Sequence, residues 1–318
     1  MTASADHPLA ADALDGLWSD PPTLPTKWLY DERGSRLFDE ITRVPEYYPT
    51  RRETEILQEH SASIAAATDA STMVEFGSGT STKTRLLLRA FADRAAQTGN
   101  GFTYVPLDVS TEILESSAVT LAADYPGIAV EPVVGDFTAP DLALPPAPGP
   151  RIVVFLGGTI GNFDDKERAV FLERLAAALA PGDFFLLGAD LVKDTGRLVA
   201  AYNDKAGVTA DFNRNMIEVL RSGLDAQGLY VDDFDHIARW NPRRHRIEMW
   251  LRARRDIDVY FEVLQRSWRL PRGAEVLTEI STKFDRRALD DELGDAGLPV
   301  VQTWTDGAED FVLALSRR

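Results

Sequence analysis

The sequence predicts an α/β protein built on a doubly wound parallel sheet, with a second α+β domain attached. Between residues 52 and 192, short apolar runs alternate with amphipathic segments, which is the rhythm of β-α-β units. Polar or glycine-rich residues end several of these runs, at the edge where parallel sheets bind ligands. After residue 193 the alternation stops, and β-rich segments joined by polar turns indicate antiparallel strands.

The elements of the parallel sheet can be placed in order along the chain. Apolar runs such as 72–76 and 151–156 are typical of strands buried on both faces, and the segments between the runs have helical periodicity. A Pro/Ala-rich stretch near residue 145 is expected to be a solvated connection. The predicted helices are 51–67, 82–96, 111–123 and 164–179, and the predicted strands are 72–76, 102–108, 127–134, 151–156 and 183–189.

The C-terminal part of the chain predicts the second domain. Residues 194–223 have a helical pattern, and 229–265 contain the β-rich strings FDHIARW, RIEMWLRAR and DVYFEVL. A helix at 285–296 and the strands PVVQTWT and DFVLALS follow. We therefore expect one domain made of 52–192 plus 284–318 and a second made of 9–51 plus 193–283.

The segment MVEFGSGTSTKTRLLLRAF at 73–91 is typical of a turn that binds a nucleotide-type cofactor. Gly77 and Gly79 allow the backbone to turn sharply and approach a ligand, and hydroxyl residues at 78 and 80–82 can cap the next helix. Thr82 stands where a dinucleotide-binding loop has its third glycine, which argues against a pyrophosphate ligand. An ordinary strand-to-helix turn is the alternative. Strand ends at Glu75, Asp108, Asp136 and 157–162 are expected to share one edge of the sheet with this turn.

Composition excludes several function classes. The 318 residues carry 34 Lys and Arg against 50 Asp and Glu, a formal charge of −16 that repels a nucleic-acid backbone. No apolar run reaches the about 20 residues that span a bilayer, and the N-terminus lacks the pattern of a signal peptide, so we expect a cytoplasmic protein. The absence of cysteine excludes disulfides and thiolate chemistry. His7, His60, His236 and His245 have no metal-ligand spacing and are interpreted as surface or packing residues.

Longer strings carry a specific resemblance. They are KWLYDERGSRLFDEITRVPEYYPTRRE at 27–53, FLGGTIGNF at 155–163, LVKDTGRLVAAYNDKAGVTADFNRN at 191–215, RIEMWLRAR at 246–254 and LTEISTKF at 277–284. With the glycine turn, they resemble the histidine Nα-methyltransferases of ergothioneine biosynthesis, over nearly the whole chain after residue 20. This family has a Rossmann-like class I methyltransferase domain, which ends in a helix and a β-hairpin, and a second domain that grips the amino acid.

The resemblance implies the activity and its cofactor. It predicts S-adenosylmethionine-dependent trimethylation of L-histidine to its betaine, hercynine, by a monomer that uses no metal. The cofactor-binding residues that it implies are Tyr30, Gly77, Lys83, Asp108 (on the ribose), Asp136 (near the adenine) and Phe137. Each has a structural alternative: Lys83, for example, could be a solvated helix charge, and Asp136 a turn residue.

The resemblance also implies a substrate site. Glu279 and Ser281, which alternate on one side of a strand, would hold the imidazole. The carboxylate and amine would be held by Tyr47, Asn162 and Tyr202, with the Gly157 carbonyl on the amine, and Phe38, Thr209 and Met249 would form apolar walls. Tyr30 and Asn162 would orient the amine and pass on its proton. Tyr47 could instead be a core tyrosine and Asn162 a turn residue, and Gly158 stands where close family members are expected to have serine.

Three other functions fit parts of the sequence. The nearest is an N-methyltransferase for another amino acid, such as a tryptophan derivative, although the polar pair Glu279 and Ser281 and the moderate size of Met249 argue against an indole pocket. A catalytically silent protein that binds the cofactor has no physical need for the combination of Tyr47, Asn162, Tyr202 and Glu279. A nicotinamide dehydrogenase is disfavoured by the missing third glycine.

Overall fold

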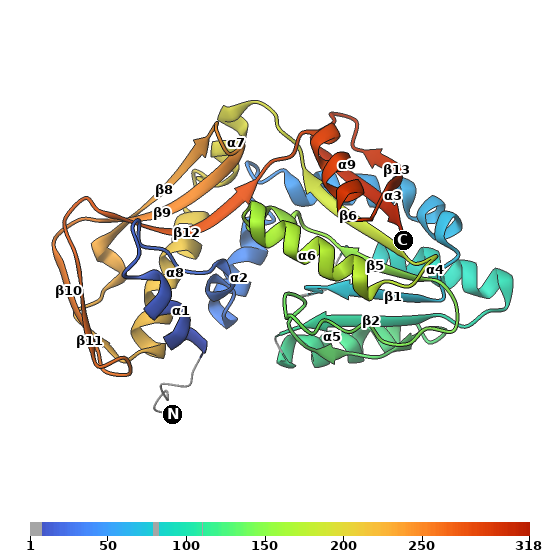
Figure 1. Ribbon diagram of the computed structural model, residues 1–318, viewed down its shortest axis with the longest axis horizontal. Coiled ribbons are helices and arrows are strands. Elements are labelled where there is room, and N and C mark those ends of the chain that lie inside the picture. Colours follow the sequence, from blue (N-terminus) through green and yellow to red (C-terminus); the bar gives the residue numbers. More distant parts are fainter. Residues whose placement is uncertain (1–7, 79–82, 110) are drawn as a thin grey trace. The chain divides into compact units, whose positions relative to one another are not determined.

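The computed structural model describes residues 8–78, 83–109 and 111–318, and the chain divides into two compact units (Figure 1). The first unit combines the described residues up to Tyr48 with Lys193–Thr282, and the second unit combines Pro49–Val192 with Lys283–Arg318. Buried apolar clusters form a separate core in each unit. The chain therefore crosses between the units at 48–49, 192–193 and 282–283.

The second unit is organised by an eight-stranded sheet of order β13-β14-β6-β5-β1-β2-β3, in which β4 also pairs with β2. Strands β1 to β6 run parallel, whereas β14 is antiparallel to both β6 and β13. The central strands are buried at every position, as expected for parallel strands covered on both faces. The bounds are β1 Thr72–Phe76, β2 Thr103–Asp108, β3 Ala129–Val130, β4 Val133–Val134, β5 Arg151–Phe155, β6 Phe184–Asp190, β13 Val300–Thr305 and β14 Phe311–Arg317.

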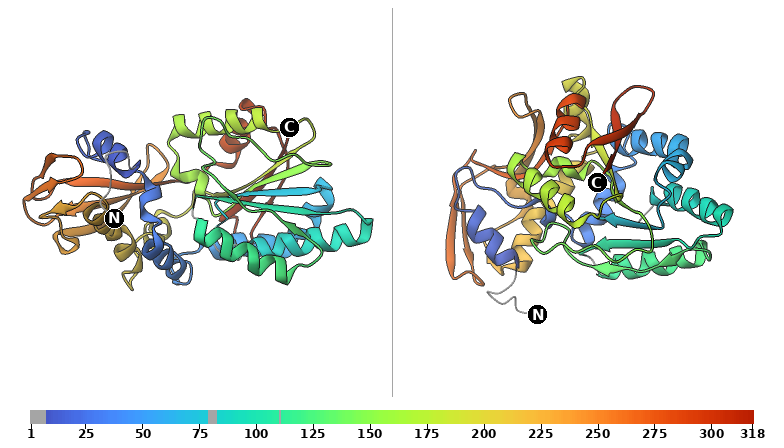
Figure 2. Two further views of the ribbon diagram at one scale, coloured as in Figure 1. Left: turned by 90° about the horizontal axis from the view of Figure 1, so that it is seen from below. Right: turned by 45° about the vertical axis from the view of Figure 1, so that its right-hand side comes forward.

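Helices cover both faces of this sheet (Figure 2). Apolar side chains of α3 (Pro49–Thr68), α4 (Thr84–Thr98) and α5 (Thr111–Asp124) fill the core on one face. Those of α6 (Asp165–Ala178) and α9 (Arg286–Asp295) fill the core on the other. Asp164 and Glu167 form a reciprocal capping box that fixes the start of α6 directly after the 3₁₀ helix η2 (Thr159–Asn162). The predicted doubly wound α/β class is confirmed.

The first unit contains two small antiparallel sheets, β12-β9-β8 and β11-β10-β7, and one shared apolar core. Its strands are β7 Ala226–Gln227, β8 Phe234–Asn241, β9 Arg246–Ala253, β10 Ile257–Phe261, β11 Arg266–Leu270 and β12 Glu275–Thr282. Its helices are α1 Pro8–Gly16, η1 Thr26–Leu29, α2 Glu32–Ile41, α7 Thr195–Ala201, α8 Val208–Gly223 and η3 Val231–Asp233.

Two sequence predictions are wrong in detail. The strand expected at 127–134 is two short, largely exposed strands, β3 and β4, because Pro132 between them has no N–H for the ladder. The helical stretch at 194–223 is broken between α7 and α8. Gly207 adopts a left-handed conformation there, and the Asp204 carboxylate accepts the N–H groups of Val208 and Thr209 at 3.0 and 2.8 Å, which starts the second helix.

Candidate functional site

In the second unit, hydrogen bonds join the carboxyl ends of the parallel strands β1, β2 and β4 at one edge of the sheet. The N–H of Gly77, after β1, donates to the carbonyl of Leu107 in β2 at 2.9 Å. The N–H of Gly135, after β4, donates to the carbonyl of Asp108 at 3.1 Å. Gly77 has a φ of +64°, a conformation that favours glycine and leaves the backbone free of a side chain where the chain leaves the sheet.

Aromatic packing fixes the segment that contains Asp136 and Phe137. The Phe137 ring stacks on Phe76 with 5.5 Å between centroids, and its edge meets Phe155 at 5.2 Å. The exposed Asp136 carboxylate accepts the N–H of Thr138 at 2.8 Å in a tight turn. These ring contacts place the Asp136 segment beside the end of β1.

Glu75 has a structural role in this unit. Its buried carboxylate accepts hydrogen bonds from Thr84 Oγ1 at 2.5 Å and from the Tyr104 hydroxyl, so it joins β1 to the start of α4 and to β2. Burial raises the pKa of Glu75 to about 7, and the hydrogen bonds from Thr84 and Tyr104 limit that rise. Glu75 lies near the carboxyl end of β1, as expected, but its side chain is buried in the interior of the unit.

Lys83, which precedes α4, is paired with a buried carboxylate that the sequence analysis missed. The side chain of Glu53, on α3, is fully buried and forms an ion pair with the Lys83 ammonium. The same carboxylate accepts the N–H of Gly157 at 2.8 and 3.0 Å. It occupies the space that a side chain at Gly188 would need, since a Cβ there would lie 2.2 Å from Glu53 Oε1. Glu53 therefore connects the glycine turn to the loop after β5.

The sequence contains a pattern that indicates the burial of Glu53. Glu53 precedes Ile56 and Leu57 by three and four positions, so it continues the buried stripe of α3. A charged residue within an apolar helical stripe indicates a buried partner, because an unpaired buried charge is costly.

The loop after β5 contains Gly157, Gly158 and Asn162. Gly157 and Gly158 have φ values of +81° and +69°, so both adopt the left-handed conformation that favours glycine. Gly158 precedes η2, and Asn162 is the last residue of that helix and is partly buried. Glycine at position 158 therefore favours the backbone conformation of this loop. It lacks the side-chain hydrogen bond that a serine would offer.

In the first unit, predicted substrate residues from separate elements form one cluster. The hydroxyls of Tyr202, after α7, and Ser281, on β12, are 2.7 Å apart and buried. The Tyr47 ring lies 6.2 Å from the Tyr202 ring and 6.1 Å from that of Phe38. Glu279 is buried two residues before Ser281 on the same strand. A carboxylate, three hydroxyl-bearing side chains and an aromatic wall are thus brought together.

Tyr30 completes this cluster. Its ring makes edge contacts with Phe38 and Phe212, each at 5.3 Å between centroids. Although 38% of its surface is exposed, loss of hydration raises the pKa of Tyr30 well above its ordinary value, and the Glu279 carboxylate adds to the shift. The phenol is therefore neutral near pH 7, so it can donate or accept a hydrogen bond but cannot act as a phenolate base.

Met249 and Thr209, the other residues predicted to form apolar walls, also belong to the first unit. Met249 is buried on β9 directly opposite Glu279 on β12. Thr209 is buried one turn before Phe212 on α8, so the two share a helix face. Phe212 also contacts Phe38 at 6.0 Å. Sequence reasoning missed this ring, because a phenylalanine on an amphipathic helix is usually only a core residue.

Partly buried polar contacts hold the segment from Tyr30 to Phe38 in place. Asp31 accepts the N–H of Gly34 at 2.7 Å and caps α2. The same Asp31 oxygen accepts Asn215 Nδ2 at 2.7 Å, and Arg33 donates to Asn215 Oδ1 at 2.8 Å. Asn215 is fully buried on α8, so these bonds tie the start of α2 to that helix.

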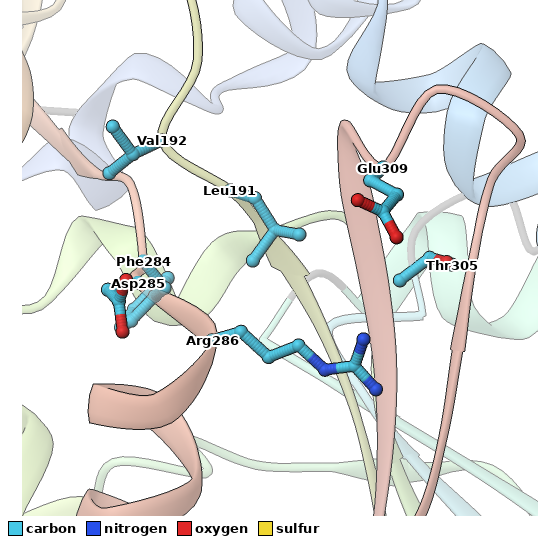
Figure 3. A pocket seen from close by; sticks show the side chains of 7 residues that line it. All are labelled: Leu191, Val192, Phe284, Asp285, Arg286, Thr305 and Glu309. Carbon is cyan, nitrogen blue, oxygen red and sulfur yellow. The ribbon is translucent and has the colours of Figure 1, made fainter.

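A small pocket elsewhere in the second unit does not contain the predicted site residues. It has a volume of about 200 Å³ and lies between the start of α9 and the β13–β14 hairpin, with Arg286 and Thr305 among its lining residues (Figure 3). Sites for small organic ligands are usually about 300 Å³ or larger. Within the described ranges, no group of three or more His, Asp or Glu is arranged to hold a metal ion, and no helix is long and apolar enough to cross a membrane.

The structure separates the predicted residues by unit. Gly77, Lys83, Asp108, Asp136, Phe137, Gly157 and Asn162 belong to the second unit, and Tyr30, Phe38, Tyr47, Tyr202, Thr209, Met249, Glu279 and Ser281 belong to the first. Gly79, Thr80, Ser81 and Thr82 of the glycine turn lie outside the described residues.

The residues of the second unit fit an adenosyl cofactor. The left-handed Gly77 keeps the end of β1 clear, and the acidic side chains Asp108 and Asp136 follow neighbouring strands on the same edge, where they suit hydroxyl and amine donors. Lys83 provides a cation whose position is set by Glu53.

Comparison with known proteins identifies the family. The family model described as "Histidine-specific methyltransferase, SAM-dependent" matches residues 9–318. The chain is 50% identical to the histidine N-alpha-methyltransferase of Mycolicibacterium smegmatis, over 99% of this chain and 96% of that protein. It is 48% identical to that of Mycobacterium tuberculosis, over 98% and 95%.

A more distant relative matches over part of its length. The chain is 31% identical to ergothioneine biosynthesis protein 1 of Neurospora crassa, over 91% of this chain and 32% of that protein. The family model covers residues 9–318, and the two bacterial relatives align with this chain over nearly their whole length. The chain belongs to the S-adenosylmethionine-dependent, histidine-specific methyltransferase family.

Proposed function

We propose that this protein transfers three methyl groups from S-adenosylmethionine to the α-amino nitrogen of L-histidine, which yields hercynine, a step of ergothioneine biosynthesis. Membership of the histidine-specific family and the identity of about half with two histidine N-alpha-methyltransferases support this activity. The structural observation that carries it is the buried cluster of Tyr47, Tyr202, Glu279 and Ser281 in the first unit. Its polar groups match the two ends of a histidine molecule.

The second unit would bind the cofactor and the first unit the amino acid. Gly77, Lys83, Asp108, Asp136 and Phe137 would hold S-adenosylmethionine, with Asp108 on the ribose and Asp136 near the adenine, and Tyr30 would also reach it. The bound cofactor supplies a methyl group activated by its sulfonium. The protein's main contribution to an in-line displacement is to align the nucleophile with that methyl group.

Histidine would be recognised at both ends. Glu279 and Ser281 would pair with the imidazole nitrogens, and Tyr47, Tyr202 and Asn162 would hold the α-carboxylate, with Phe38, Thr209 and Met249 as walls. Buried polar groups that the wrong side chain leaves unpaired are penalised, which gives selectivity beyond shape. An indole has one N–H and no acceptor nitrogen, so it cannot satisfy both Glu279 and Ser281.

The amine must be neutral, because an ammonium has no lone pair to attack the methyl carbon. The neutral Tyr30 phenol and Asn162 would orient the amine, and the Gly157 carbonyl would accept one of its N–H groups. The proton would leave outward through these hydrogen bonds. Aromatic faces of Tyr30, Phe38 and Tyr47 would stabilise the growing cation by about 1 to 2 kcal/mol when desolvated, so later methyl groups can be added without loss of the carboxylate anchor.

Two further properties belong to the same proposal. The protein would act as a monomer and in the cytoplasm, as expected from the sequence. Light scattering during size-exclusion chromatography tests the first property, and fractionation of the source cells tests the second.

A substrate panel tests the activity. Purified protein is incubated with S-adenosylmethionine and each standard amino acid separately, and products are detected by mass spectrometry. We expect only L-histidine to gain one, two and finally three methyl groups. Methylation of tryptophan in preference to histidine would assign the protein to another substrate, and no product from any amino acid would contradict a methyltransferase of free amino acids.

A further inference from the structure

A chain of hydrogen bonds in the first unit leads from β12 to the backbone of Tyr202. Thr278 Oγ1 donates to Asn213 Oδ1 at 2.5 Å. Asn213 Nδ2 lies 2.9 Å from His236 Nδ1, and His236 Nε2 lies 2.9 Å from the carbonyl oxygen of Tyr202. Asn213 and Thr278 are buried, so little water competes for these bonds. The chain connects β12, α8 and β8 to the residue that ends α7.

The partners fix the direction of the two hydrogen bonds of His236. Asn213 Nδ2 also donates to the carbonyl of Trp250 at 3.1 Å, and a carbonyl can only accept, so the amide NH₂ faces both Trp250 and His236. His236 Nδ1 must therefore accept, which leaves the proton on Nε2, where it is donated to Tyr202. His236 is thus a neutral imidazole in its Nε2–H tautomer.

The surroundings of His236 agree with this protonation state. Burial lowers its pKa and the nearby Arg214 acts in the same direction, while the Tyr202 carbonyl and Asp204 act in the opposite direction. A protonated ring would direct a second N–H at the Asn213 NH₂ group, which has no lone pair to accept it. The neutral form is the one that the hydrogen-bond geometry requires.

Tyr202 is consequently held at both ends. His236 binds its backbone carbonyl, and Ser281 binds its hydroxyl at 2.7 Å. Tyr202 lies directly before the loop that separates α7 from α8, where no regular helix would otherwise define the direction of its carbonyl. A change at the carbonyl would tilt the ring and displace the hydroxyl from Ser281.

We propose that His236 is a positioning residue for the amino-acid substrate: through the Tyr202 carbonyl it sets where the Tyr202 hydroxyl meets the substrate carboxylate. The inference rests on the proposed function, because it assumes that Tyr202 contacts histidine. His236 itself does not touch the substrate. The sequence alone suggests a surface or packing residue. In this proposal, His236 instead orients Tyr202.

Two substitutions separate positioning from packing. In His236→Gln, the amide nitrogen can take the place of Nε2 and keep the bond to Tyr202. In His236→Asn, the shorter side chain can take the place of Nδ1 and keep the bond from Asn213, but it loses the bond to the Tyr202 carbonyl. We expect the Asn variant to raise KM for histidine about tenfold, the loss typical of one hydrogen bond, and the Gln variant to stay within about threefold of wild type.

The controls distinguish the possible outcomes. Affinity for S-adenosylhomocysteine, measured by calorimetry, should be unchanged in both variants, as should the far-ultraviolet circular dichroism. Equal KM values for the Asn and Gln variants, whether raised or normal, would overturn the positioning role. A wild-type protein that turns over another amino acid but not histidine would contradict the proposed function instead, and KM for that substrate would then be compared.

A second measurement is made on the wild-type protein. Two-dimensional ¹H–¹⁵N correlation of the imidazole rings in the wild-type protein reports the tautomer of each of the four histidines, and the signals lost in His236→Gln assign His236. We expect a neutral ring with its proton on Nε2 at pH 7. A proton on Nδ1, or on both nitrogens, would overturn the directed chain to Tyr202.

Discussion

The hydroxyl oxygens of Tyr202 and Ser281 lie 2.7 Å apart, although 79 positions separate the two residues in the sequence. One is on the residue that ends α7 and the other is on β12, and both are buried. One hydroxyl must donate its proton to the other. The hydroxyl that donates can then only accept a hydrogen bond from a ligand, whereas the other can still donate one. In the proposed site this bond links the group that holds the carboxylate to the group that holds the imidazole.

A double-mutant cycle measures this link. Tyr202→Phe and Ser281→Ala should each weaken histidine binding about five- to tenfold, as expected for the loss of one hydrogen bond. The double variant should lose about 1 kcal/mol less than the sum, because both single variants break the same bond. Calorimetry with histidine in the presence of S-adenosylhomocysteine gives the values, and strictly additive losses would show that the two hydroxyls act independently.

Glu279 should determine selectivity for the imidazole. Removal of its carboxylate in Glu279→Ala should raise KM for histidine about a hundredfold, because a bond to a charged group contributes about 1.5 to 3 kcal/mol. Glu279→Gln keeps the shape and one acceptor, so its loss should be smaller. Affinity for the cofactor product should stay at the wild-type value in both variants. A Glu279→Ala enzyme with normal KM for histidine would remove Glu279 from the imidazole site.

Glu53 should contribute to the stability of the folded protein. Glu53→Ala leaves the Lys83 ammonium and the Gly157 N–H without their partner, and breaking a buried ion pair typically costs about 3 to 5 kcal/mol. Denaturant unfolding should show a lower midpoint for Glu53→Ala than for Glu53→Gln, which retains an acceptor for Gly157. Identical midpoints for wild type and Glu53→Ala would mean that the ion pair contributes nothing to the folded state.

Glu75 predicts how stability depends on pH. Below its ordinary pKa of 4.5 the carboxyl is protonated in both folded and unfolded chains, so it contributes no dependence. Between 4.5 and about 7 the unfolded chain releases the proton while the folded protein keeps it, so the free energy of unfolding falls as pH rises. The fall attributable to this group is about 3 kcal/mol and is complete above pH 7.

Glu75→Gln isolates that contribution. The variant lacks the ionisable group, so its stability relative to wild type should improve progressively between pH 4.5 and 7. Denaturant titrations of both proteins at a series of pH values measure the difference. A difference that is constant across this window would show that Glu75 does not have a raised pKa.

Several elements could be predicted closely from the sequence. The strand at 72–76 is found with the predicted bounds, because a short apolar run between a helix and a glycine turn has few other stable conformations. The helix predicted at 164–179 is found at Asp165–Ala178, where Asp164 and Glu167 supply a recognisable capping box. Propensity and periodicity determine such segments locally.

Other features depend on contacts between distant residues. The burial of Glu53 requires Lys83 and Gly157, 30 and 104 positions away, and periodicity cannot show that these three groups meet. Similarly, the sequence pattern indicates only that Phe212 is a helical core residue. Its contacts with Tyr30 and Phe38 are seen only in the folded structure. The break before α8 did have a local signal, since Asp204 and Gly207 are typical of a helix start, but the helical pattern on both sides outweighed it.

The position of the transferred methyl groups is the most direct test of the account. Histidine is incubated with S-adenosylmethionine labelled with ¹³C in its methyl group, and the product is analysed by two-dimensional NMR. We predict one labelled methyl resonance of three equivalent groups that correlates with the α-hydrogen of histidine, as in hercynine. Label on an imidazole nitrogen, or no labelled histidine, would contradict the proposed orientation of the substrate.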